Sequence, residues 1–514
     1  MSVHSPEQTV SQWLATYDTP DADVAHLLCD RHDPTAVAFT FVDTDLGVRR
    51  LSYGELGELS RRMATVLAEH GVRRGDRVPV LMGKGVDLVV ILLALWRLGA
   101  VHVPLFTAFA TGAIEVRVTG SGARLVVTEP SQRAKLAPLT GIEVLLTGPE
   151  LDSAVAAAEP LAANVAVGGS EPFLLLFTSG TTGKPKGVPV AVRALAAFHC
   201  YLHYSLDVQP DDVFWNAADP GWAYGLYYGI VGPLVAGRPN IVHAGGFTPE
   251  STVAVARALG VTNFAGAPTM YRALSKSGAV SGVRLRRASS AGEPLTPDVI
   301  DWSVQTLGCE VRDHYGQTET GMTICNNWHP DAARELKPGS MGRGMPGYTA
   351  GVVDGEIALD VARSPLLWFT GYLDAPEKTA ERFTADGAWY LTADTGRVDV
   401  DGDLFFTARD DDVILAAGYR IGPFDVESVL VTHPAVVDVA VVGRPDPEGV
   451  RGEQVEAFVV LAEGTAPDDA LAAELKTLVR EEYSLHAYPR VVHFVESLPK
   501  TPSGKVQRYL LREG

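Results

Sequence analysis

Strand-like and helix-like runs alternate from residue 36 to about residue 410. The run AVAFTFVD (36–43) predicts a strand, and apolar residues at helical spacing from Ser52 to Glu69 predict the helix that follows. The stretch 88–96 is apolar throughout and predicts a buried helix between the strands VPVLM and VHVPL. The same succession of strand, helix and strand recurs around ARLVVTE, NIVHAG and TNFAGAP. Such alternation is typical of α/β proteins with largely buried sheets, and two pseudo-repeated halves would account for it.

The pattern changes after the acidic cluster 410–412. Pro423 suits the first turn of a helix that runs to Val431, and two strands, VVDVAVVG and QVEAFVVL, follow it. An amphipathic helix over residues 468–483 and the strand RVVHFV complete a small α+β unit. We therefore predict an N-terminal domain over residues 1–409, a hinge at 410–412 and a C-terminal mobile domain over 413–514.

The composition, 46% hydrophobic and 20% charged over 514 residues, excludes a disordered chain, a collagen and a small disulfide scaffold. The formal net charge of −19 repels polyphosphate backbones and anionic membrane surfaces, so we expect no nucleic-acid partner and no membrane partner. The four cysteines stand far apart and form no zinc or disulfide pattern, which favours a reducing compartment. Because no apolar run approaches the ~20 residues that span a bilayer and the N-terminus is not signal-like, a cytoplasmic protein is expected.

The most informative stretch is PFLLLFTSGTTGKPKGVPV (172–190), in which an apolar strand runs into a loop rich in glycine, hydroxyl groups and lysine. Glycines let backbone N–H groups turn towards an anion, and hydroxyls and lysines add donors and charge, so the loop suits a polyphosphate. It is not a Walker A loop, because Pro185 follows Lys184 where Ser or Thr should open a helix. The alternative is an exposed turn in a hairpin. The candidate phosphate-binding residues are Thr178, Ser179, Gly180, Thr181, Thr182, Gly183, Lys184 and Lys186.

A second glycine-rich stretch, GRGMPG (342–347), fits the pattern GxGxxG of dinucleotide-binding turns. It follows no predicted strand and contains Pro346, so we reject it as a dinucleotide site.

The stretch 172–190 resembles the phosphate-binding signature of the adenylate-forming superfamily, which contains acyl-CoA synthetases, luciferases and the adenylation domains of peptide synthetases. Further matches follow in the expected order at SSAGEPL, DHYGQTETG, WYLTADTGRVD, ARDDDVILAAGYRIGP and LPKTPSGKVQR. The resemblance covers essentially the whole chain, and its motifs are most similar to those of acetyl-CoA and medium-chain acyl-CoA synthetases. It implies an α/β fold: a large N-terminal domain of two pseudo-repeated α/β halves plus a β subdomain, with a small α+β C-terminal lid domain.

The resemblance also implies roles in nucleotide binding. Glu319 matches the Mg²⁺-binding glutamate, with Thr318 beside it on the phosphate, and Lys505 matches the lysine that stabilises charge on the α-phosphate. Taken alone, these would be a surface carboxylate and a solvated lysine. Asp394 and Arg409 match the ribose-binding pair, whose alternative is a surface ion pair. The positions that enclose adenine are Gly292, Glu293, Pro294, Asp313, His314 and Tyr315, which could otherwise be an ordinary buried turn and strand end.

A further set of matches concerns the acid, CoA and domain movement. Asp411 matches the hinge, although a turn aspartate is an equally simple reading, and Gly418, Tyr419 and Arg420 match residues beside the pantetheine channel. ADPGWAYG (218–225) resembles the acyl-pocket and gate region, with Trp222 as gate or as core residue. Gly225 and Gly266 are further candidates for the pocket wall. Two departures, Ala408 for glycine and Leu415 for a polar residue, flank the hinge and leave open how it moves.

The size of the acid can be argued from Gly316. Acetate-specific relatives carry a tryptophan at this position, directly before the QTET sequence, so glycine favours a medium-chain, aromatic or bulky acid over acetate. No charged residue is obviously placed to hold an amino group, which disfavours amino acids.

The resemblance predicts an acyl-CoA synthetase that uses ATP, Mg²⁺ and CoA, acts on a small carboxylic acid and is a possible homodimer. The carboxylate would attack the ATP α-phosphate, pyrophosphate would leave, and the CoA thiol would then displace AMP. Three alternatives stay open at this point: loading of a carrier protein, thioester formation alone from acyl-AMP supplied by another enzyme, and a non-catalytic nucleotide-binding relative.

Overall fold

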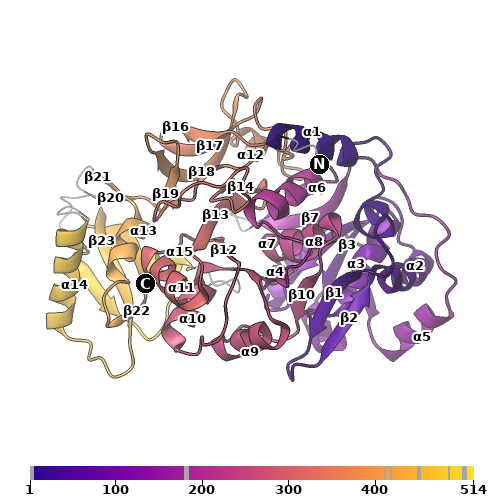
Figure 1. Cartoon of the computed structure of the whole chain (residues 1–514), viewed down its shortest axis with the longest axis horizontal. Helices are drawn as coiled ribbons and strands as arrows, with labels where there is room; N and C mark the ends of the chain where they lie inside the picture. The colour runs from indigo at the N-terminus through magenta and orange to yellow at the C-terminus, as the bar shows by residue number, and fades with distance from the viewer. Residues whose placement is uncertain are drawn as a thin grey trace.

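The structure is a computed structural model, and it describes residues 5–178, 185–409, 412–416, 419–447, 453–483, 487–500 and 506–513. Its first half contains a six-stranded sheet in the order β6, β5, β3, β4, β7, β8 (Figure 1). The strands are β3 (Arg77–Leu81), β4 (Val101–Leu105), β5 (Leu125–Thr128), β6 (Glu143–Leu146), β7 (Pro172–Thr178) and β8 (Lys186–Ala191). The helices of this part are α2 (Tyr53–Glu69), α3 (Val86–Arg97), α4 (Thr111–Ser121) and α5 (Pro149–Ala157). The pairs are parallel except β7 with β8, which run antiparallel.

A second, nine-stranded sheet has the order β15, β14, β13, β12, β11, β9, β10, β1, β2. Its strands are β1 (Val37–Val42), β2 (Val48–Ser52), β9 (Phe214–Asn216), β10 (Asn240–His243), β11 (Asn263–Gly266), β12 (Arg287–Ala291), β13 (Val311–Gln317), β14 (Gly321–Cys325) and β15 (Arg343–Gly344). Its helices are α1 (Pro6–Tyr17), α6 (Ala194–Cys200), α7 (Ala223–Gly225), α8 (Gly232–Ala236), α9 (Pro249–Leu259), α10 (Pro268–Ser277) and α11 (Pro297–Leu307). The two sheets correspond to the two predicted α/β halves.

The rest of the chain forms smaller sheets at one end of the molecule, coloured orange to yellow in Figure 1. An antiparallel sheet contains β16 (Ala350–Val353), β17 (Glu356–Asp360), β18 (Trp389–Val398) and β19 (Leu404–Arg409), with α12 (Pro376–Ala380) between β17 and β18. The C-terminal part contains β20 (Ile414–Ala416), β21 (Tyr419–Ile421), α13 (Pro423–Leu430), β22 (Val436–Pro445), β23 (Glu453–Leu461), α14 (Asp469–Glu482), β24 (Val491–Phe494) and α15 (Arg508–Glu513). The predicted fold class is therefore confirmed: a large α/β part, a β subdomain and a small α+β part.

Local sequence explains why the predicted elements form where they do. The hydroxyl of Ser52 accepts a hydrogen bond from the backbone of Glu55, whose carboxylate accepts one from the backbone of Ser52, so a capping box starts α2. In α3 every residue from Leu88 to Arg97 is buried, which confirms the predicted core helix. Within the described ranges, none of the helices combines the length and the apolar character that crossing a bilayer requires.

Candidate active site

The predicted metal-binding carboxylate lies in the tight turn between β13 and β14. The side chain of Glu319 is only 6% exposed, so the alternative reading as a surface carboxylate does not hold. Its Oε1 accepts a hydrogen bond of 2.8 Å from the hydroxyl of Tyr372. Within the described part of the chain, its Oε2 has no hydrogen-bond partner in the protein. A buried carboxylate with one oxygen held and one oxygen available is a good first ligand for a cation.

The site offers Mg²⁺ one protein carboxylate, that of Glu319. Among the residues that the structure describes, no three His, Cys, Asp or Glu side chains gather into a metal cage. Mg²⁺ is commonly held by one or two carboxylates together with substrate phosphates and water, and it does not need such a cage. Glu319 can therefore be the protein ligand of a Mg²⁺ ion that arrives with a polyphosphate, where the ion would neutralise phosphate charge.

Two cations stand beside this carboxylate. Arg382 donates through Nε to the Tyr372 hydroxyl at 2.9 Å, and the Lys186 ammonium lies 4.6 Å from the centre of the Tyr372 ring. Burial is the main cause that lowers the pKa of Lys186, and the positive charge of Arg382 lowers it further. The negative charge of Glu319 opposes this shift but does not cancel it. Two cations crowded around one carboxylate make a site suited to a further anion, as a triphosphate would be.

Of the phosphate-loop candidates, the structure describes only Thr178 and Lys186. Thr178 ends β7 and is in register with Lys186 of the antiparallel strand β8, and the ammonium of Lys186 lies beside Tyr372. The candidates Ser179, Gly180, Thr181, Thr182, Gly183 and Lys184 lie outside the described residues. The antiparallel pairing of β7 with β8 does not decide between a phosphate-binding loop and an exposed turn, and the phosphate-binding role stays a prediction.

The predicted ribose-binding pair is brought together by strand register. Asp394 of β18 pairs directly with Arg409 of β19 across the antiparallel ladder, although the side chain of Arg409 is not described. The carboxylate of Asp394 is 8% exposed, and its Oδ2 accepts hydrogen bonds from Tyr315 at 2.5 Å and from Gln317 at 2.8 Å. The adenine motif on β13 and the ribose motif on β18 are thus joined side chain to side chain.

The other adenine candidates hold two strand ends together. Asp313 is buried, and its Oδ1 accepts a 2.8 Å hydrogen bond from the hydroxyl of Ser290 at the end of β12. Gly292 follows with φ of 103°, a conformation that favours glycine, and nothing lies within 4 Å of where its Cβ would be. Glu293 forms a 2.9 Å ion pair with Arg272, and Pro294 is half-buried beside it. His314 is also buried, and its Nδ1 is 2.7 Å from the hydroxyl of Tyr201.

Asp313 should make the stability of the fold depend on pH. Burial raises its pKa to about 7 from the model-peptide value of 3.8, despite the hydrogen bond from Ser290. A carboxyl whose folded pKa is raised stabilises the fold fully below the unfolded pKa and loses that contribution as pH rises towards the folded pKa. We expect the melting temperature of Asp313→Asn to gain on that of the wild type between pH 4 and pH 7, in thermal melts at matched ionic strength. Parallel profiles of the two proteins would contradict this assignment.

The gate candidate Trp222 packs as an aromatic core residue. Its ring lies 5.2 Å from that of Phe106 and 5.5 Å from that of Phe109, measured between centroids. Its indole N–H is buried without a hydrogen-bond partner in the described residues. This packing is that of the core reading, and the role of Trp222 as a gate stays a prediction.

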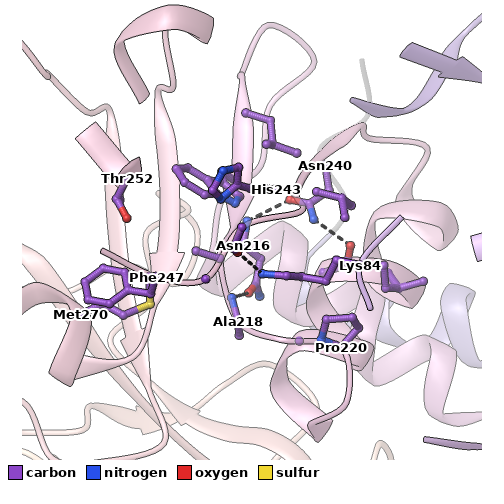
Figure 2. A pocket seen from close by; sticks show the side chains of 18 residues that line it. Lys84, Asn216, Ala218, Pro220, Asn240, His243, Phe247, Thr252 and Met270 are labelled. Atoms are coloured by element: carbon purple, nitrogen blue, oxygen red, sulfur yellow. Dashed lines mark hydrogen bonds between the residues drawn. The ribbon is translucent and has the colours of Figure 1, made fainter. Parts of the chain in front are cut away.

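A small cavity lies beside Gly225, between β9 and β10. Figure 2 shows Lys84, Asn216 and His243 around it. Its volume of about 30 Å³ is sufficient for a water molecule and far too small for an acyl chain. Gly266 is close to this cavity only through Met270, whose sulfur would lie 3.2 Å from a Cβ at position 266. The pocket for a bulky acid is thus not open at these two glycines in this structure.

Gly316 has a packing requirement of its own. A Cβ at this position would lie 2.1 Å from the carbonyl oxygen of Gly321 and 2.6 Å from the Cα of Met322, because β13 is irregular here. The direction of the missing side chain is therefore filled by the backbone of β14, and the glycine itself does not open a cavity towards solvent.

Replacing Gly316 should accordingly destabilise the fold. We expect Gly316→Ala to lower the free energy of unfolding by about 2 kcal/mol or more, since overpacking against backbone cannot be relieved by side-chain rotation. Chemical denaturation followed by circular dichroism measures this. Gly112→Ala on α4 is the matched control, because nothing lies within 4 Å of a Cβ there and it should be neutral or stabilising. Equal stability of the two variants would refute the steric reading.

The structure describes the remaining predicted residues only in part or not at all. Lys505, Asp411 and Gly418 are outside the described residues, and Tyr419 and Arg420 are placed only as backbone on β21. Their predicted roles in catalysis, in the hinge and beside the CoA channel stay predictions. Three residues of the site were not predicted: Gln317, Tyr372 and Arg382. Gln317 stands inside the QTET sequence and could have been found there, whereas Tyr372 and Arg382 lie outside every motif quoted from the sequence.

Known proteins match both parts of the chain. A family model described as AMP-binding enzyme matches residues 29–362, and one described as AMP-binding enzyme C-terminal domain matches residues 425–505. This chain belongs to the AMP-binding enzyme family. The acetyl-coenzyme A synthetase of Bacillus subtilis (strain 168) is 36% identical over 528 residues, which cover 96% of this chain and 91% of that protein.

Solved structures of AMP-binding enzymes agree. The crystal structure of an acyl-CoA synthetase from Brucella canis is 44% identical with a TM-score of 0.76, covering 98% of this chain and 96% of that one. A benzoate CoA ligase from Burkholderia xenovorans LB400 is 29% identical with a TM-score of 0.84, covering 95% and 99%. The predicted family and fold class are confirmed.

The reaction follows from this family membership. The chain is an AMP-forming acid–thiol ligase, in which ATP activates a carboxylic acid as acyl-AMP and CoA then takes the acyl group as a thioester. It uses ATP, Mg²⁺ and CoA, and its substrates are an acid, ATP and CoA. The predicted reaction class and cofactors are confirmed at this level.

Proposed function

We propose that the buried turn at Glu319 and the carboxylate of Asp394 are the two ends of one ATP site, at which the acyl-adenylate forms. The supporting observation is that Gln317, two residues before Glu319 in the chain, donates a 2.8 Å hydrogen bond to the carboxylate of Asp394 on β18. Glu319 would hold Mg²⁺, and Lys186 with the loop after Thr178 would bind the phosphates. Lys505 would reach the α-phosphate from the C-terminal part.

The chain's own residues then have distinct tasks. Asp394 accepts hydrogen bonds from ribose hydroxyls while Tyr315 and Gln317 fix its second oxygen. Lys186 and Lys505 neutralise phosphate charge, so that the substrate carboxylate can approach a second anion. Positioning and charge neutralisation are sufficient, because phosphoryl-type transfer needs little covalent help from the protein.

We propose further that the acid is larger than acetate and carries no amino group. Between the motif 218–225 and β13 lies an aromatic cluster in which the Tyr201 hydroxyl contacts both Tyr224, at 3.0 Å, and His314. Burial lowers the pKa of His314 to about 3, so this imidazole is neutral at pH 7. An aromatic cluster beside the predicted acyl-pocket motif supports an aromatic or medium-chain acid, as does the similarity to a benzoate CoA ligase.

A panel of acids tests both proposals. Acetate, butyrate, octanoate, benzoate and phenylalanine are offered with ATP, Mg²⁺ and CoA, and pyrophosphate and acyl-CoA are measured in parallel. We expect kcat/KM for benzoate or octanoate to exceed that for acetate by about tenfold or more, as pocket contacts allow. Preference for acetate would refute the acid class. Pyrophosphate without acyl-CoA would indicate a carrier protein, and acyl-CoA only from supplied acyl-AMP would indicate the second half-reaction alone.

We propose, finally, a homodimer that resides in the cytoplasm and makes no stable contact with nucleic acid or membranes. The net charge of −19 supports the last part through repulsion from anionic surfaces. Light scattering on the purified protein and co-sedimentation with anionic vesicles test these statements, and a monomer or a vesicle-bound fraction would refute them.

A further inference from the structure

Tyr372 stands at the centre of the charged part of the site. Its side chain is 6% exposed, and its hydroxyl contacts the carboxylate of Glu319 at 2.8 Å and the Nε of Arg382 at 2.9 Å. Its ring lies under the ammonium of Lys186, at 4.6 Å. One phenol thus touches the candidate metal ligand, a half-buried cation and the candidate phosphate lysine.

The directions of the two hydrogen bonds are fixed by chemistry. An arginine guanidinium can only donate, so the hydroxyl of Tyr372 must accept from Arg382. The single proton of the hydroxyl is then left for Glu319, where it is donated to Oε1. The bond orients the carboxylate so that Oε2 stays free of protein partners within the described residues.

The loop that carries Tyr372 is itself held on two sides. The backbone N–H of Tyr372 donates to the hydroxyl of Thr379 on α12 at 2.9 Å. The next residue, Leu373, donates from its N–H to the carbonyl of Gly187 on β8 at 2.8 Å. The phenol is therefore positioned relative to the strand that bears Lys186 as well as to the turn that bears Glu319.

We propose that Tyr372 is a positioning residue that presents Glu319 to Mg²⁺. This inference rests on the proposed role of Glu319 and extends it to a residue that no sequence motif marks. Partners of a metal ligand outside the coordination sphere typically raise metal affinity about 10- to 100-fold by fixing the ligand's orientation. The ring adds a second effect, since the cation–π contact keeps Lys186 beside the carboxylate without forming an ion pair that would compete with the metal.

Tyr372→Phe tests the proposal, because it keeps the ring and its contact with Lys186 and removes only the hydroxyl. The measurement is binding of Mn²⁺, followed by electron paramagnetic resonance, in the presence of an ATP analogue that is not cleaved between the α and β phosphates. No acid is present, so the readout is independent of turnover. We expect the dissociation constant of Mn²⁺ to rise about tenfold. A change below twofold would overturn the proposal.

Tyr271→Phe is the matched control. Tyr271 is equally buried, and its hydroxyl donates only to the backbone carbonyls of Phe264 and Ser289, away from Glu319. This variant should lose stability but keep the wild-type affinity for Mn²⁺. If it weakened Mn²⁺ binding as much as Tyr372→Phe does, a general loosening of the core would explain the result and the proposal would fail.

Thioester formation from supplied acyl-AMP reports whether Tyr372→Phe is folded, because that step needs no triphosphate. If the variant does not fold, Arg382→Lys replaces it: it keeps the charge but removes the planar donor that fixes the hydroxyl, and weaker Mn²⁺ binding is again expected. Wild-type affinity in Arg382→Lys would then overturn the proposal.

Glu319→Gln separates the failure of this inference from that of the proposed site. If the wild type and Glu319→Gln bind Mn²⁺ equally, the metal role of Glu319 is wrong. If Glu319→Gln loses Mn²⁺ and Tyr372→Phe keeps it, only the role of Tyr372 is wrong.

Discussion

Lys505→Ala is expected to reduce acyl-AMP formation about a hundredfold while leaving thioester formation from supplied acyl-AMP largely intact. A preorganised cation at developing charge contributes on the order of 3 kcal/mol to lowering the barrier, which corresponds to that factor in rate. The charge is needed only while pyrophosphate leaves, so the second half-reaction does not depend on it. Pyrophosphate release and acyl-CoA production from acyl-AMP, measured separately, check the two steps.

The chain offers a control within the same segment. Lys500 pairs with Asp438 and forms a β-bridge with Val506, and it is five residues before Lys505 in the sequence. Lys500→Ala removes an equal charge and should change neither half-reaction by more than about twofold, as exposed ion pairs contribute little. Equal loss of both half-reactions in Lys505→Ala would show that this lysine is not specific to adenylation.

Glu319→Gln is expected to lower acyl-AMP formation by a factor of about a hundred or more. Glutamine keeps the shape and retains an acceptor for the hydroxyl of Tyr372, but it removes the negative charge that a divalent cation requires. Raising the Mg²⁺ concentration should restore part of the rate, since the defect is in metal affinity. Initial rates of pyrophosphate release across a Mg²⁺ titration measure both effects.

Glu381→Gln is the control for Glu319→Gln. Glu381 is exposed and pairs with Lys378 at 2.7 Å, so it is a nearby carboxylate without a buried setting. Its replacement should leave the Mg²⁺ titration unchanged. A Glu319→Gln protein with normal rates at low Mg²⁺ would mean that the metal is held by the nucleotide alone.

Much of the architecture could be predicted from the sequence, because buried parallel strands and core helices leave strong apolar runs. The predicted strand 36–43 corresponds to β1, and the apolar run 88–96 lies inside α3. The β subdomain came only from the resemblance, since strands such as β16 and β17 are short and partly exposed and carry a weak pattern. Boundaries at the predicted hinge stay predictions.

Site residues could be predicted from the sequence only where they belong to a short, recognisable motif. Glu319 and Thr318 stand in one short sequence, and Asp394 and Arg409 are opposite each other by strand register. Tyr372 could not be predicted, because its role depends on a loop that packs between two distant segments. Gly316 shows the converse: its identity was visible in the sequence, but the backbone that fills its side-chain direction was not.

The register of β18 against β19 connects the proposed ribose-binding carboxylate to the predicted hinge. Asp394 pairs with Arg409, which is the last residue of β19 and directly precedes the predicted hinge at 410–412. A rotation at this hinge would begin one or two residues after Arg409. It would therefore act directly on β19, the strand that pairs with Asp394. Movement of the C-terminal part and release of AMP would then be coupled. A crosslink that prevents this movement would also keep the nucleotide bound.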